Sequence, residues 1–286
     1  MPTTQLRLAL AIAATVIVLP WPMCAQDSPC SQTPGVNVML GSEAIGMPGR
    51  HAAPYTGKVR TTFEQKLADG NTIHSSSEVR EARDSEGRWM TERQMGCAPG
   101  SDGQMHPLTF VNVNDPVAHT SMNWTEGDDL QPKVVHVFHQ PQPQTPIQKQ
   151  ELTPEQQEQR QKMLEALQTR AQDQRADTRT EQLGTKTIAG IGADGFRTTR
   201  TIPAGAQGND LPMEIVNETW RSKDLGLTLM RINDDPRRGR TTAEYIELQQ
   251  GEPDPALFNP PAGYTIEEQT LTGNVTGGII GSTMNP

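Results

Sequence analysis

Residues 183–264 consist of short strand-like segments separated by turn residues at regular intervals. In order, the segments read GTKTIAGI, GFRTTRTI, MEIVNETW, LGLTLMRI and RTTAEYIEL, and DPALFNPPAGY closes the stretch. Segments rich in β-branched residues and bounded by Gly, Asp and Pro predict antiparallel strands joined by tight turns. The stretch contains no catalytic motif, so it predicts an architecture rather than an activity.

A similar pattern precedes this stretch. Within residues 58–67, Val59 and Phe63 fall on one side of a strand and the charged residues fall on the other, which predicts a half-buried strand. Asp69 and Gly70 then predict a hairpin turn. Further strands are expected over residues 72–83, 88–95, 108–113, 119–124 and 133–138.

An insertion separates the two sets of strands. Residues 140–150 alternate Pro and Gln, which predicts an extended linker. Thr153 is the expected N-cap of a helix that runs to about Thr178, with Pro154 at its first position and Gln156 completing a capping box. The helix is so polar that we expect it to be mostly solvated, resting on the sheet at most through one apolar patch. The patch comprises Met163, Leu164 and Leu167.

These segments together predict a mainly β (α+β) fold, an antiparallel curled sheet or half-barrel of about 9–11 strands with one long polar helical insertion. Residues 54–270 are expected to form this single domain, with the linker and helix inserted at 140–182. Residues 26–53 are rich in Gly, Pro and Ser and predict a flexible leader. Residues 271–286 predict a flexible tail.

The N-terminus has the pattern of a secretory signal peptide. Arg7 precedes an apolar run over residues 8–19, and Ala25 follows shortly as a small residue before polar sequence. We expect residues 1–25 to be the signal peptide, cleaved after Ala25, and the protein to be exported to the periplasm or secreted. No later segment is apolar enough to be transmembrane.

The net charge and the cysteines further limit the functions open to this chain. Removing Arg7 with the signal peptide leaves 24 Lys and Arg against 34 Asp and Glu, a net charge of −10. Such an acidic chain is not suited to bind nucleic acid or an anionic membrane surface. The mature chain keeps Cys30 and Cys97, which in an oxidising compartment either form a disulfide that pins the leader to the first strands or remain unpaired thiols.

No catalytic or metal site stands out. His119, His136 and His139 are close in sequence, but positions three apart on a strand point to opposite faces, so we expect solvated or edge histidines and no metal site. Glu214 and Glu218 share strand parity with Trp220 and could act as acid and base. Alternating charges on a wet sheet face explain these two carboxylates better.

Two further motifs lack the context that catalysis needs. Residues 75–77 are serines with no Gly-x-Ser-x-Gly elbow around them. The glycines of residues 190–195 lie between two strands, whereas a phosphate loop needs a following helix. We therefore expect no enzyme activity and no cofactor.

Trp89, Trp124 and Trp220 are the aromatic candidates for a ligand face. Packing in the core or across strands is the more frequent role for tryptophan. Only 34% of residues are hydrophobic and 4% are aromatic, so the core must be thin. A sheet with one buried and one wet face fits that limit.

The chain also carries a family pattern. A Glu-x-Trp strand (Glu218 and Trp220) is followed by a Ser-x-x-Leu turn and by a final Asp-Pro-x-Leu-Phe-x-x-Pro segment. Most of residues 54–268 resembles a group of uncharacterised exported bacterial proteins. Residues 183–264 more distantly resemble the lipoprotein-carrier superfamily of LolA, LolB and the sensor RseB. The resemblance implies a half-barrel whose concave face binds acyl chains, lipoproteins or envelope signals.

We therefore expect an exported envelope protein that acts as a non-enzymatic binding or carrier module for an apolar or amphipathic ligand, such as a lipid or acyl chain, or for a lipoprotein. The alternative is an interaction or regulatory protein of the envelope-sensor kind, which binds an envelope protein through its acidic surface and its exposed helix. A roomy apolar trough would favour carriage, and a filled or charged face would favour the alternative.

Overall fold

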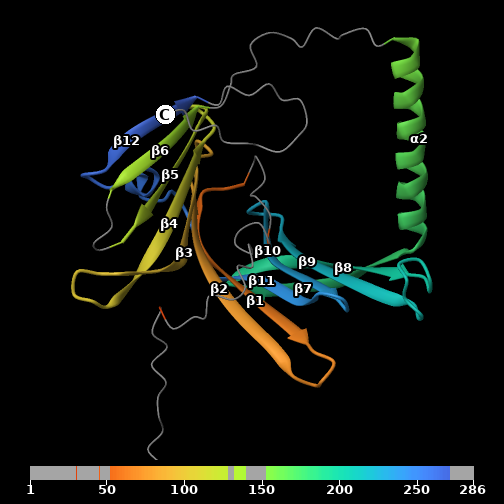
Figure 1. Cartoon of the computed structure of the whole chain (residues 1–286). Coiled ribbons are helices and arrows are strands. Elements are labelled where there is room, and N and C mark those ends of the chain that lie inside the picture. The colour runs from red at the N-terminus through yellow and green to blue at the C-terminus, as the bar shows by residue number, and fades with distance from the viewer. Residues whose placement is uncertain (1–29, 31–44, 46–51, 128–131, 140–152, 271–286) are drawn as a thin grey trace, which may run out of the picture.

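The computed structural model describes residues 30, 45, 52–127, 132–139 and 153–270, which are coloured in Figure 1. Within them, twelve strands form a single curled sheet that does not close, one strand more than the predicted range. The predicted mainly β half-barrel is confirmed. In chain order the elements are β1 (Tyr55–Lys66), β2 (Thr72–Arg83), β3 (Trp89–Pro99), β4 (Met105–Asp115), β5 (Thr120–Glu126), β6 (Val134–His139), α2 (Pro154–Ala176), β7 (Thr178–Ile188), β8 (Ile191–Ile202), β9 (Met213–Ser222), β10 (Leu227–Asp235), β11 (Gly239–Gln250), η1 (Pro255–Phe258) and β12 (Thr265–Thr270).

Strand β1 joins the two halves of the sheet. The strand order is β12-β6-β5-β4-β3-β2-β1-β11-β10-β9-β8-β7, so β1 lies between β2 and β11. On each side of β1 the strands follow one another as a meander of antiparallel hairpins. The regularly spaced turns read from the sequence produce these hairpins.

The C-terminal segment does not complete the second half of the sheet. Residues 254–264, which the sequence places at the end of the second set of strands, carry the chain across to the first half, where β12 pairs in parallel with β6. The cause is apolar burial, because Phe258 of η1 is buried in a cluster formed by β2 to β6. The other buried members of this cluster are Ala82, Met90, Val111, Val113, Trp124, Val135 and Val137.

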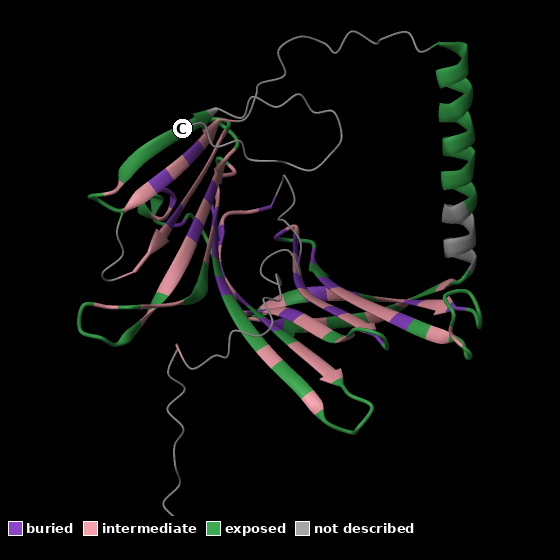
Figure 2. Ribbon diagram, viewed as in Figure 1, coloured by how far each residue is buried: buried purple, intermediate pink, exposed green. Residues whose placement is uncertain are grey.

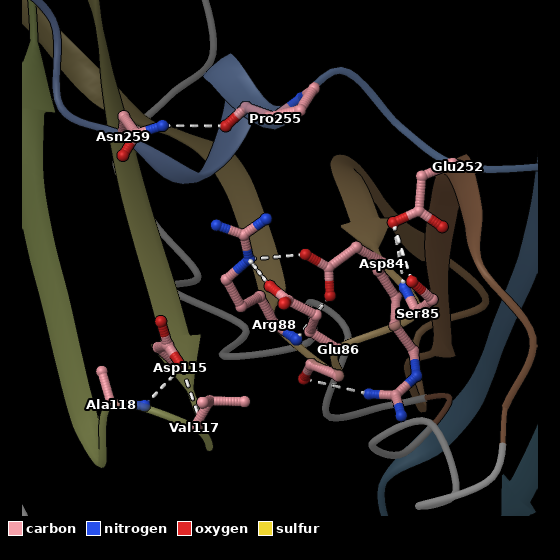
Figure 3. A network of polar contacts seen from close by, with 12 residues as sticks. Asp84, Ser85, Glu86, Arg88, Asp115, Val117, Ala118, Glu252, Pro255 and Asn259 are labelled. Atoms are coloured by element: carbon pink, nitrogen blue, oxygen red, sulfur yellow. Dashed lines mark hydrogen bonds and ion pairs between the residues drawn. The ribbon is translucent and has the colours of Figure 1, made fainter.

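Polar contacts fix this crossing segment to the turn between β2 and β3 (Figure 3). The guanidinium of Arg88 lies 4.8 Å from the centre of the Phe258 ring, and its Nε donates to Asp84 Oδ2 at 2.5 Å. Glu252 Oε1 accepts hydrogen bonds from the backbone N–H and the hydroxyl of Ser85 at 3.2 and 3.1 Å. Residues far apart in the sequence are therefore tied together where the C-terminal segment leaves the second half.

The apolar core lies on opposite faces of the two halves. We call the face of β1 and β2 that carries Tyr55 and Glu81 the inner face, and the face that carries Ala82 the outer face. The core cluster of the second half includes Tyr55, and Ile45 and Ala52 from the segment before β1 pack into it. The cluster of the first half contains Ala82 and is covered by η1 on the outer face.

The remainder of the outer face carries ion pairs between neighbouring strands. Each such pair contributes at most about 1 kcal/mol because its members are exposed to solvent. The pairs match the wet side that the sequence predicts for the first strand. They are Arg80–Glu92, Arg60–Glu78, Lys58–Glu247 and Arg240–Asp234.

Helix α2 begins with the predicted capping box. The N–H of Thr153 donates to Gln156 Oε1 at 3.0 Å, and the N–H of Gln156 donates to Thr153 Oγ1 at 3.3 Å. The helix stands away from the sheet, and its described side chains are exposed along its length (Figure 2). Met163, Leu164 and Leu167 are 65%, 48% and 48% exposed, so the expected apolar patch does not rest on the sheet.

Cys30 and Cys97 form a disulfide in the structure, with their Cα atoms 5.7 Å apart. Cys97 lies on β3, so the bond links the segment before the sheet to the third strand. It closes a loop over a sequence separation of 67 residues that contains β1 and β2.

We expect reduction of this bond to lower the free energy of unfolding by about 2–4 kcal/mol, because the bond restricts the unfolded chain more than the folded one. Urea unfolding followed by circular dichroism, with and without a reductant, measures the difference. The double variant Cys30→Ser/Cys97→Ser is the control, since a reductant cannot affect it. Equal stability of the oxidised and reduced wild-type protein would contradict the prediction.

Several expectations fall on residues that the structure does not describe. They are the signal peptide over residues 1–25 with its cleavage after Ala25, most of the leader over 26–53, the linker over 140–152 and the tail over 271–286. Among the helices of the described residues, none has the length and apolar character needed to cross a membrane.

Candidate binding face

Seven residues form a straight row across the inner face of the first half, because each lies directly opposite the next in the strand register. Neighbouring strands are about 4.8 Å apart, so successive residues of the row follow one another at that spacing. Its middle part offers two amides, a hydroxyl and an imidazole, and we call these four residues (Thr91, Asn112, Asn123 and His136) the polar row. The complete row is Gly57, Glu81, Thr91, Asn112, Asn123, His136 and Glu267.

The polar row is half-buried, and its asparagine side chains lack hydrogen bonds to the described part of the protein. The side-chain amides of Asn112, Asn123 and the adjacent Asn114 make no hydrogen bond to any residue in the described part of the chain. On the same face, the buried Trp89 Nε1 has no hydrogen-bond partner among the described residues, and His136 Nδ1 lies 3.5 Å from Glu267 Oε2. Half-buried amides without protein partners remain open to hydrogen bonds with water or with a bound ligand.

Aromatic residues flank the polar row on both sides. Trp89 and Phe138 lie on the inner face in the row that also contains Asn114, as the strand register shows. Phe110 lies on the other side of the polar row, and the guanidinium of Arg93 is 5.3 Å from the centre of its ring. The face therefore combines flat apolar rings with neutral hydrogen-bonding groups.

A buried carboxyl group stands at the inner end of the row. Glu81 is 1% exposed, and its Oε2 accepts hydrogen bonds from the hydroxyls of Tyr55 at 3.0 Å and Tyr245 at 2.7 Å. The Tyr245 ring lies against Gly57, where a side chain would leave it no room. Glu81 Oε1 is buried without a hydrogen-bond partner.

Burial raises the pKa of Glu81 above its ordinary value, although the hydrogen bonds from Tyr245 and Tyr55 act in the opposite direction. Burial, together with the negative charge of Glu81, also raises the pKa of both tyrosines. Arg83, on the same strand, donates to the backbone oxygens of Ala52 and Gly87. The cluster therefore favours a protonated Glu81.

We expect Glu81→Gln to gain stability relative to the wild type as the pH rises above about 4.5. The folded protein binds the Glu81 proton more tightly than the unfolded chain, whose reference value is 4.5, so ionisation costs wild-type stability between that value and the raised folded pKa. The relative gain should be about 1.4 kcal/mol for each unit of the pKa difference.

Urea unfolding of wild type and Glu81→Gln between pH 4 and 8 measures this gain. Glu244→Gln, which removes a carboxylate from the exposed outer face, is the control for a change in net charge. A stability difference between wild type and Glu81→Gln that stays constant over the whole range would show that the carboxyl does not titrate as inferred.

The histidines lie as the strand parity predicts. His136 is on the inner face with its Nδ1 3.5 Å from Glu267 Oε2, and His139 is on the opposite side with its Nε2 3.6 Å from Glu268 Oε2. His119 is in the turn between β4 and β5 with a φ of 55°. In the described residues, no three His, Cys, Asp or Glu side chains gather as metal ligands would.

Glu214 and Glu218 do not meet as an acid–base pair in the structure. Glu218 Oε1 accepts a hydrogen bond from Arg197 Nη2 at 2.6 Å, so its charge is neutralised by an ion pair. Glu214 lies in a separate hollow of about 310 Å³ on the face of β7 to β9. The lining of that hollow is polar: Asp177, Thr178, Arg179, Thr199, Thr201 and Glu214.

The other two motifs are structural. Residues 75–77 lie in β2 opposite β1. Ala189 and Gly190, with φ of 47° and 82°, form the tight turn between β7 and β8, and a strand follows rather than a helix.

The three tryptophans have different surroundings. Trp124 is buried in the outer cluster and donates to Glu126 Oε1 at 2.8 Å. Trp220 packs in the core of the second half, with the Lys186 ammonium 4.0 Å from its ring centre. Trp89 is the tryptophan that lies on the inner face beside the polar row.

Sequence reasoning missed Tyr55, Glu81, Tyr245 and the asparagines of the polar row. The available signal at Glu81 was that it shares strand parity with the apolar Val79 two residues earlier. Asn112 and Asn123 belong to no catalytic motif, and each alternates with apolar residues along its strand. Bringing them into one row required the long-range strand register.

No family model and no curated protein matches the chain. Solved structures that the chain matches include the MucA/MucB complex of Pseudomonas aeruginosa, at 13% identity and a TM-score of 0.30, covering 73% of this chain and 56% of that one. The chain thus spans little more than half of MucB.

Two other similar structures are spanned almost completely. An uncharacterised conserved protein of Thermus thermophilus has 9% identity and a TM-score of 0.34, with 77% of this chain and 92% of that one covered. A LolA-superfamily protein of Nitrosomonas europaea has 7% identity and a TM-score of 0.23, with 73% and 91% covered. The solved structures similar to this chain therefore include the kinds of protein that its sequence distantly resembles.

Proposed function

We propose that the protein is an exported, non-enzymatic binding protein that holds an amphipathic ligand on the inner face of β2 to β6. The observation that carries the proposal is the polar row, whose half-buried amides lack partners in the described chain and lie between aromatic rings. A ligand with hydrogen-bonding groups and apolar surfaces would pair with the amides and pack on the rings.

Carriage of a purely apolar ligand has less support. The two apolar clusters are filled by the protein's own side chains, including Phe258 in one and Ile45 in the other. The hollow on β7 to β9 is lined by polar residues. Covering the amides of Asn112 and Asn123 with hydrocarbon would cost about 1–3 kcal/mol for each unpaired group.

Catalysis has less support as well. Glu81 is buried between two tyrosines, and Glu218 is held by Arg197. Within the described residues, these groups do not converge with a nucleophile or a metal set in one cleft. The signal sequence over residues 1–25 and the disulfide between Cys30 and Cys97 support export to an oxidising compartment.

Nuclear magnetic resonance titration of the mature protein tests the proposal. Three classes of probe are added in turn: neutral hexasaccharides, phosphatidylglycerol–phosphatidylethanolamine vesicles and extended octapeptides. We expect one class to shift the amide signals of Thr91, Asn112 and Asn123. The absence of any shift on the inner face with all three classes would overturn the proposal.

A second candidate function rests on helix α2, the docking of an envelope protein partner. Its apolar patch of Met163, Leu164 and Leu167 is exposed on a helix that stands away from the sheet. Crosslinking in cells should then trap a protein that is lost in Leu164→Asp/Leu167→Asp but retained in Gln161→Asp/Gln168→Asp, which adds the same charges to the helix. Equal capture by the two variants would contradict this role.

A further inference from the structure

We infer that the ligand of the inner face is a neutral oligosaccharide bound across the strands, one sugar ring to each strand. This inference rests on the proposed function and names the class of ligand that the face would take. Three properties of the face lead to it: the chemistry of its unpaired groups, the placement of its aromatic rings and the spacing of its rows.

The unpaired groups of the polar row are neutral and can both donate and accept. Each of Asn112 and Asn123 offers an amide NH₂ and a carbonyl oxygen, and Thr91 offers a hydroxyl. Sugar hydroxyls also donate and accept, so they can pair with every one of these groups. An acyl chain can pair with none of them.

The complete row contains neither Lys nor Arg, which argues against an anionic ligand. Arg83 donates to the backbone oxygens of Ala52 and Gly87, and Arg93 lies over the Phe110 ring. At the edge of the row, His136 faces the carboxylate of Glu267. A phosphate or carboxylate on the ligand would therefore meet no free cation within the row.

The aromatic rings suit the C–H faces of sugars. Trp89 and Phe138 lie on one side of the polar row, and Phe110 lies on the other. A pyranose ring has an apolar face of C–H groups and an equatorial belt of hydroxyls, so it can pack on a ring while its hydroxyls reach the amides.

The spacing of the row fits the repeat length of a glycan better than that of an extended peptide. Thr91, Asn112, Asn123 and His136 follow one another at the strand spacing of about 4.8 Å. An extended peptide advances about 3.3 Å per residue and would lose register with the row after two strands. The length of one sugar unit is close to the strand spacing, so successive rings would meet equivalent groups.

The same titration decides the ligand class. Cellohexaose, chitohexaose and maltohexaose are added separately to the mature protein, and dissociation constants are taken from the shifts of the Asn112 and Asn123 side-chain amides. We expect at least one hexasaccharide to bind, and Asn112→Ala/Asn123→Ala to weaken it about tenfold or more. Thr91→Val, which keeps the side-chain shape, should weaken it several-fold.

Asn217→Ala is the matched control, because that amide lies on the second half and accepts from Asn233 at 2.6 Å. It should leave the hexasaccharide affinity unchanged. Circular dichroism verifies that every variant is folded at the temperature used.

Two results would overturn the inference while leaving the proposed function intact. The first is binding of vesicles or octapeptides to the inner face when no hexasaccharide binds there. The second is hexasaccharide affinity that is unchanged in both Asn112→Ala/Asn123→Ala and Thr91→Val, with another probe still shifting the inner face. If no probe of any class moves the inner face, the inference and the proposed function both fail.

Discussion

Phe258→Ala is expected to lower the free energy of unfolding by about 3–5 kcal/mol, the cost typical of removing a fully buried phenylalanine. Phe258 is 2% exposed and closes the outer cluster of the first half. Its removal would leave a cavity against Met90 and Val113 and would take away the ring beneath Arg88. Urea unfolding of wild type and variant measures the change.

Phe196→Ala provides the matched control. Phe196 lies on β8 and is 40% exposed, so the same chemical change removes far less buried surface and should cost about 1 kcal/mol or less. Equal losses in the two variants would show that η1 does not seal the outer cluster. Hydrogen exchange at β12 should also accelerate in Phe258→Ala, since η1 leads directly into that strand.

Tyr245→Ala should also lower the free energy of unfolding by about 3–5 kcal/mol, because it removes both packing and a hydrogen bond. Tyr245 is 2% exposed, and its ring meets that of Tyr55 edge-on with centroids 6.0 Å apart. Its hydroxyl is one of two donors to Glu81 Oε2. Without it, the buried carboxyl keeps a single donor beside an empty space.

Tyr245→Phe separates the two contributions. It keeps the ring and should cost about 1–3 kcal/mol, the usual loss when a buried acceptor gives up a partner. Tyr264→Phe is the comparison, since that hydroxyl donates to the backbone oxygen of Thr125 in a less buried position. A Tyr245→Phe variant as stable as the wild type would mean that Glu81 does not depend on this donor.

Local chemistry predicted the elements of this fold well. Alternation in residues 58–67 placed Val59 on the buried side of β1, and Asp69 with Gly70 marked the first hairpin. The capping box of Thr153 and Gln156 fixed the start of α2. These features depend on residues close in sequence, so a single sequence contains the information needed to find them.

The placement of the C-terminal segment could not be predicted in that way. The residues of DPALFNPPAGY indicate a short turn of helix and an extended end, but not the sheet half against which Phe258 packs. The position of Phe258 is determined by its packing in the cluster around Met90 and Val113, which is far away in sequence. It also decides that β12 pairs in parallel with β6.

The candidate site was predictable only in outline. A sheet with a binding face was expected, and Trp89 was among its candidate residues. Asn112 and Asn123 carry no motif, and they become a site only when the register aligns them with Thr91 and His136. The contact of Glu81 with Tyr245 likewise depends on the pairing of β1 with β11.

The position of β1 between β2 and β11 has a consequence for the order of folding during synthesis. Tyr55 pairs with Gln250, so β1, which is synthesised first among the described strands, must wait for one of the last before both its edges are bonded. Contacts of such separation slow folding and leave an edge open to other chains in the interval. Lys58, Arg60 and Glu64 along this strand would discourage intermolecular pairing until the C-terminal half arrives.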